Sequence, residues 1–155
     1  MKLSTDKIYK AFYVLMQAKY GKLDNEEKIK VWKISRALKP IANQFEDDGK
    51  DAAEQLKPTE DWEDRQMKAM EYERKVRLKN FDPATLPMGP AEFDQWNREK
   101  LKYDKLVNEA MKEFAEKEVE VVFDPISEET FGKLLDSNDF SFDQVVALGD
   151  VITKQ

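Results

Sequence analysis

The chain has 155 residues, and its 26 Lys and Arg against 32 Asp and Glu give a formal net charge of −6. It contains neither Cys nor His, which excludes disulfides, thiolate nucleophiles, Ser-His-Asp triads and zinc sites built from these ligands. With 37% charged residues, 41% hydrophobic residues and only five Gly, the composition favours long solvated helices, in one domain or in one domain and a small appendage.

Residues 4–48 predict an antiparallel helical hairpin. Its first helix begins near Ser4 or Thr5, which can cap free amides, and is expected to end at Gly21, a residue suited to a left-handed closing position. Apolar residues recur at helical spacing along one face of this helix. They are Ile8, Ala11, Phe12, Leu15 and Met16.

The second helix of the hairpin is expected to open at Asp24, because Glu27 stands at the capping-box position. Pro40 lies inside the apolar pattern, so we expect one bent helix that continues past it and ends around Asp48 and Gly49. Its apolar stripe is Val31, Ile34, Leu38, Ile41 and Phe45.

An irregular, charged segment covers residues 51–90. A helix is expected after Thr59, but its end, Lys75–Lys79, also alternates like an edge strand, and both interpretations stay open. Pro and Gly at positions 83, 87, 89 and 90 predict a loop over residues 80–90.

A long third helix is predicted over residues 90–117, with Pro90 as its first residue and its end at about Glu116. Its apolar side is Phe93, Trp96, Tyr103, Leu106, Val107, Ala110 and Phe114. We therefore expect a helical body over residues 1–117.

A C-terminal cap is expected over residues 118–155. It begins with a strand, Val119–Phe123, whose partner is residues 75–79, residues 1–3 or another subunit. Two short helices follow, capped by Ser127 and by Ser141. Their buried faces are predicted to be Phe131, Leu134 and Leu135, then Val145, Leu148 and Ile152. The fold class is thus mainly α, with a helical hairpin, a long third helix and a cap of one short strand and two short helices.

Three tryptophans and one acidic cluster remain as candidate binding residues. Trp32 and Trp96 fall on or beside apolar stripes and are expected in the core, and Trp62, flanked by four acids, is interpreted as a structural anchor rather than a contact for another protein. The cluster Glu46, Asp47, Asp48 and Asp51 does not match the register of a calcium loop and is expected to be a solvated turn.

No residue stands out as catalytic, cofactor-binding or metal-binding, so the sequence predicts a non-enzymatic protein without a cofactor. A pI near 4.9 argues against nucleic acid as a partner, and Lys75–Lys79 is expected to be a solvated edge. The longest apolar run, Ala11–Met16, is too short to cross a membrane, and a soluble, unexported protein is expected.

Three stretches of the chain form a pattern that is known from other proteins. They are Lys2–Ile8 with the hairpin that carries Leu38-Lys39-Pro40, Tyr103–Val121, and Ile126-Ser127 with Ser141–Leu148. In these stretches the chain resembles a family of small tailed-bacteriophage proteins of unassigned function. The resemblance covers roughly residues 1–46 and 101–152 and implies a phage or prophage origin and a helical hairpin fold.

The resulting hypothesis is a phage protein that works by contact with another protein or with itself. It would be a virion component or a tail or head assembly factor, located in the virion or the host cytoplasm. The alternative is a phage-encoded inhibitor that binds a host or defence enzyme.

Overall fold

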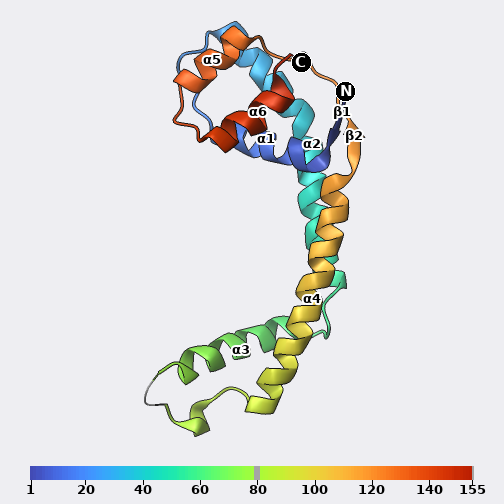
Figure 1. Ribbon diagram of the computed structural model, residues 1–155, viewed down its shortest axis with the longest axis vertical. Coiled ribbons are helices and arrows are strands. Elements are labelled where there is room, and N and C mark those ends of the chain that lie inside the picture. The colour runs from blue at the N-terminus through green and yellow to red at the C-terminus, as the bar shows by residue number, and fades with distance from the viewer. Residues whose placement is uncertain (79–80, 155) are drawn as a thin grey trace. The chain divides into compact units, whose positions relative to one another are not determined.

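The computed structural model describes residues 1–78 and 81–154 and shows a mainly helical protein with one short two-stranded sheet, as predicted (Figure 1). The chain forms two compact units, residues 1–48 with 112–155 (unit 1) and residues 49–111 (unit 2). This division differs from the expected body and cap, because the C-terminal elements share unit 1 with the hairpin. The elements are β1 (Lys2–Ser4), α1 (Thr5–Gln17), α2 (Asn25–Gln55), α3 (Trp62–Val76), the 3-10 turn η1 (Pro83–Thr85), α4 (Pro90–Glu116), β2 (Glu118–Glu120), α5 (Glu128–Asp136) and α6 (Phe142–Ile152).

Helix α1 begins where the sequence predicts and ends earlier. The Ser4 side chain accepts a hydrogen bond from the amide of Lys7, but the helix stops at Gln17 and not at Gly21. The reason is a tertiary contact with a residue that is distant in the sequence. The Asn138 side chain accepts a hydrogen bond from the amide of Lys19 at 2.7 Å and donates one to the carbonyl of Lys19 at 2.8 Å. These backbone groups are satisfied outside the helix, so the chain leaves the helix without a left-handed glycine.

Helix α2 has the predicted start and a later end. Asp24 and Glu27 form the reciprocal capping box, at 2.8 and 3.0 Å, and the helix continues through Pro40. It then runs to Gln55 instead of ending at Gly49, and the acidic cluster expected in a turn lies within it. A Cβ at position 49 would stand 2.9 Å from Sδ of Met111, so this glycine permits a close approach rather than ending the helix.

The core of unit 1 lies between α1, α2 and the C-terminal helices. Leu38 and Ile8 are fully buried, and Ile41 packs against this cluster, as the predicted stripes require. Met16, predicted on the same stripe as Ile8, is instead 64% exposed. Helices α5 and α6 complete the core, and Figure 1 shows α6 lying across α1. The buried residues of the cluster are Ile8, Ala11, Phe12, Leu15, Leu23, Val31, Ile34, Leu38, Ala42, Val121, Ile126, Leu134, Leu148, Val151 and Ile152.

The two strands form an antiparallel pair in which Leu3 lies opposite Val119 (Figure 1). The amide of Val121 also donates to the carbonyl of Met1 at 3.0 Å. The prediction that residues 1–3 supply the partner is therefore confirmed, although β2 is shorter than the predicted strand. The alternative prediction, that residues 75–79 pair with this strand, is wrong for residues 75–78. Lys75 and Val76 end α3, and residues 77–78 form a turn. Lys79 lies outside the described residues.

The two C-terminal helices start at their predicted caps. The Ser127 side chain accepts from the amide of Thr130, and Ser141 and Gln144 form a complete capping box. Leu134, Leu148 and Ile152 are fully buried, as expected. These caps could be predicted because each depends only on residues three positions apart.

Unit 2 has its own aromatic core between α3 and α4. The rings of Trp62 and Trp96 stack with centroids 6.0 Å apart, and only 2% of Trp62 is exposed, so its interpretation as a structural anchor is confirmed. The phenol of Tyr103 donates to the carbonyl of Ala53 at 2.8 Å. Helix α4 has its predicted bounds, but Trp96 is its one buried residue and Leu106 is 47% exposed.

Candidate functional site

The described residues hold no group of three or more acidic side chains arranged to bind a metal ion. Within residues 1–78 and 81–154, no helix combines the length and hydropathy of a membrane span. The features that bear on function are an exposed tryptophan and an apolar groove in the helical hairpin.

Trp32 lies at the surface, which corrects its predicted place in the core. Its exposed fraction is 56%, whereas Val31 and Ile34 on the same helix are almost fully buried. The buried face of α2 passes through Val31, and the next residue in a helix is turned by about 100°. Trp32 therefore points away from the core, and the guanidinium of Arg36 lies 5.4 Å from the centre of its ring.

Beside Trp32 the two hairpin helices leave a groove of about 320 Å³, which we call the hairpin groove. Apolar and aromatic side chains dominate its wall, and Met16 on its rim is 64% exposed. Ile29, one turn before Trp32 on the same helix, is 53% exposed. The lining residues are Leu15, Met16, Tyr20, Lys28, Val31, Trp32 and Ser35.

Comparisons with protein-family models, with curated protein sequences and with solved structures find no match for this chain. A function must therefore be inferred from the residues themselves.

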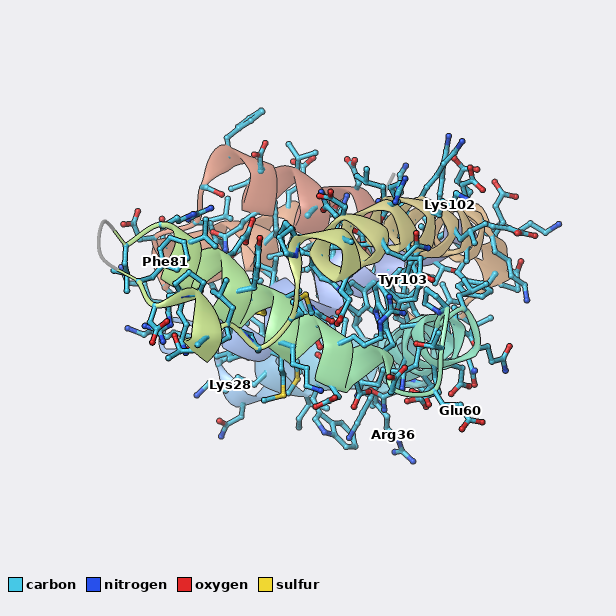
Figure 2. All side chains as sticks on the ribbon, turned by 90° about the horizontal axis from the view of Figure 1, so that it is seen from below. Lys28, Arg36, Glu60, Phe81, Lys102 and Tyr103 are labelled. Atoms are coloured by element: carbon cyan, nitrogen blue, oxygen red, sulfur yellow. The ribbon has the colours of Figure 1, made fainter. Side chains whose placement is uncertain are left out.

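The part of the hairpin that carries the groove, residues 7–45, is positively charged although the whole chain is acidic and the hairpin as a whole, residues 4–48, carries only +2. Residues 7–45 contain nine Lys and Arg and three Asp and Glu, a net charge of +6, and the rest of the chain carries −12. Five of these cations lie along α2, and all five are exposed. They are Lys28, Lys30, Lys33, Arg36 and Lys39. In Figure 2 the labelled side chains of Lys28 and Arg36 extend away from the α2 ribbon.

None of these five α2 cations forms an ion pair with a carboxylate of the described residues. Arg36 is engaged with the ring of Trp32 instead. By contrast, Lys75, which belongs to the predicted solvated edge, donates to the carbonyl of Thr85 at 2.8 Å and lies 3.8 Å from the carboxylate of Glu71.

One acid in the first turn of α2, Glu27, is already satisfied within the fold. The backbone amide of Asp24, the ammonium of Lys133 and the hydroxyl of Thr130 all donate to its carboxylate. These hydrogen bonds, the Asp24 amide first, lower the pKa of Glu27 to about 2. Its negative charge is therefore held against α5 and is not available to neutralise the α2 cations.

Tyr20 lines the groove together with Met16. Its hydroxyl donates to the carbonyl of Leu15, and burial raises its pKa above the ordinary value, so the ring is fixed and uncharged at neutral pH. The groove is thus a preformed apolar surface bordered by unpaired positive charge. Such an arrangement can hold an apolar side chain and attract carboxylates next to it.

Proposed function

We propose that this chain is a non-enzymatic protein that works by binding another protein through the hairpin groove. The exposed side chain of Trp32 beside an apolar groove carries the proposal. Tryptophan contributes more than most residues to protein interfaces, because it combines a large apolar surface with little loss of conformational freedom.

The burial of the other two tryptophans supports this choice. Trp62 and Trp96 are 2% and 6% exposed and serve the core of unit 2. Trp32 has no such role; it lines the groove with Met16, and Ile29, also exposed, lies one turn before it on α2. Clusters of exposed apolar side chains of this kind mark interaction surfaces in soluble proteins.

For the biological setting we propose a phage or prophage protein, either a virion component or a tail or head assembly factor. Support for this setting is the resemblance of residues 1–46 and 101–152 to small tailed-phage proteins. A groove that accepts a partner protein would also serve an inhibitor of a host or defence enzyme, so the identity of the partner distinguishes these roles.

A site-specific crosslinking experiment tests the proposal. A photo-crosslinking amino acid is placed at Met16, which is 64% exposed on the groove rim, and in a control chain at Leu101, which is 67% exposed on α4 of unit 2. Each chain is produced in the cells in which its gene naturally occurs, and these cells are irradiated. The crosslinked adducts are then identified by mass spectrometry.

We expect one protein adduct from position 16 that position 101 does not give. A virion protein in that adduct supports the structural or assembly role, and a host enzyme supports the inhibitor. Absence of an adduct, or the same adducts from both positions, would refute binding through the groove.

A further inference from the structure

We propose that the hairpin groove binds an acidic segment of a partner protein that carries one bulky apolar side chain. This inference rests on the proposed function and adds the chemistry of the partner. In the complex the apolar side chain occupies the groove beside Trp32, and the carboxylates of the segment pair with Lys28, Arg36 and Lys39.

The positions of the cations on α2 give the first argument. Lys28, Arg36 and Lys39 lie four residues before, four after and seven after Trp32, so all three share its face of the helix. At about 1.5 Å per residue this row spans roughly 16 Å along the helix axis. That length accommodates several carboxylates of one peptide segment while its apolar side chain reaches the groove.

The missing counter-charges give the second argument. The three cations of this row are exposed, and no described carboxylate lies within ion-pair distance of them. Some exposed cations on other helices do have such partners, for example Lys68 with Asp64 at 3.1 Å and Lys10 with Asp6 at 2.9 Å. A surface that concentrates unpaired positive charge in an acidic protein is complementary to an acidic partner.

The apolar wall of the groove favours a protein over a nucleic acid as the source of the negative charge. Leu15, Met16 and Val31 offer aliphatic surface that matches an apolar side chain, whereas single-stranded nucleic acids bind to rows of aromatic rings. Outside residues 7–45 the chain carries −12, which repels a long polyanion but not a short acidic segment that stays within that stretch.

The test uses an unbiased peptide library and five forms of the 155-residue chain. A library of random peptides of about 12 residues is displayed on yeast and selected for binding to the wild-type protein. Selected peptides that also bind the Trp32→Ala protein are then discarded. Because Trp32 is 56% exposed, its replacement leaves the fold intact, which circular dichroism and the melting temperature verify.

Two charge variants measure the contribution of the cations. The hairpin triple variant carries Lys28→Gln, Arg36→Gln and Lys39→Gln. The control triple variant carries Arg98→Gln, Lys102→Gln and Lys105→Gln, which removes one exposed Arg and two exposed Lys from α4. The two variants have equal net charge, so a difference between them reports position and not total charge.

We expect the selected peptides to be acidic and to contain a large apolar residue. The selected peptide with the lowest Kd should bind the hairpin triple variant about tenfold more weakly than the wild type, since three exposed ion pairs together supply roughly that factor. The control triple variant should bind that peptide as the wild type does. Raising the salt from about 50 to about 300 mM should weaken binding to the wild type more than to the hairpin triple variant.

The outcomes separate the two proposals. If no peptide depends on Trp32, the groove is not a binding site and the proposed function fails. If such peptides are neutral or basic, or bind both triple variants equally, the groove binds proteins but the inferred acidic partner is wrong. The inference is also overturned if an oligothymidylate of about 20 nucleotides binds in a manner that depends on Trp32. A dimer in sedimentation velocity that Trp32→Glu abolishes would likewise overturn it, by assigning the groove to a second copy of the chain.

Discussion

Replacing Leu38 by Ala tests the packing that holds the groove-bearing hairpin in place. The Leu38 side chain is fully buried in the core of unit 1. The substitution removes three carbon atoms, which at about 0.8 kcal/mol for each buried methylene is roughly 2.4 kcal/mol of lost transfer free energy. The cavity left between tightly packed neighbours adds to this, so we expect the free energy of unfolding to fall by about 2–5 kcal/mol.

Urea denaturation followed by far-UV circular dichroism measures this loss. With a urea dependence of about 2 kcal/mol per molar, a loss of about 3 kcal/mol lowers the midpoint by roughly 1.5 M. Leu101→Ala is the matched control, because the same atoms are removed from a side chain that is 67% exposed, and its midpoint should stay near that of the wild type.

A second probe separates the two units during unfolding. In a Trp32→Phe background the remaining tryptophans, Trp62 and Trp96, belong to unit 2 and report its unfolding by fluorescence. A loss below about 0.5 kcal/mol for Leu38→Ala, or a loss equal to that of Leu101→Ala, would refute the packing described here.

Three further predictions concern acid stability, the sheet and the second core. The folded-state pKa of Glu27, about 2, lies below its ordinary value of 4.5, so its stabilising effect is complete above about pH 4.5 and is lost as the pH falls toward 2. Glu27→Gln should reduce the dependence of the free energy of unfolding on pH between about 4.5 and 2. Glu26→Gln, at an exposed neighbouring position, should leave this dependence as in the wild type. Val121→Pro removes the amide that donates to the first residue's carbonyl, and urea denaturation should show a loss of at least about 1–3 kcal/mol; an unchanged midpoint would contradict the pairing. Trp62→Ala should cost about 3–5 kcal/mol in the unfolding of unit 2, whereas Trp32→Ala should change the stability of the protein by less than about 0.5 kcal/mol, and calorimetry of the two variants compares them directly.

Features that depend on neighbouring residues in the chain could be predicted from the sequence. The capping residues Asp24, Ser127 and Ser141 and the first residue of α4, Pro90, were all identified because each signal is complete within one turn of helix. The pairing of β2 with the first residues also followed, since a strand beside helices needs a partner for its backbone groups.

Features that depend on distant residues could not be predicted in this way. The end of α1 at Gln17 depends on Asn138, which is 119 positions from the Lys19 backbone that it binds. The prediction for Trp32 was wrong because the sequence pattern around a tryptophan beside an apolar stripe is the same whether its ring points into the core or away from it. Its exposure becomes clear only once Val31 and Ile34 are seen to fill the core side of α2.

The candidate site was missed for a different reason. A net charge of −6 for the whole chain concealed the +6 of residues 7–45, because a single total averages over surfaces that a partner meets separately. Counting charges over shorter stretches of the sequence would have shown the basic stretch of residues 7–45, whereas the groove between Leu15 and Val31 requires the packed helices.

Unit 1 is discontinuous in sequence, and this affects its folding during synthesis on the ribosome. Its core joins residues 1–48 to residues 112–155, and the hydrogen bond from the Thr5 hydroxyl to the Lys117 carbonyl closes a separation of 112 positions. The residues of unit 2 all leave the ribosome before this second part does, so unit 2 can complete its aromatic core first. Until residues 112–155 pack against them, the apolar faces of the hairpin remain uncovered. A chaperone that shields exposed apolar surface would therefore bind the nascent chain at residues 1–48.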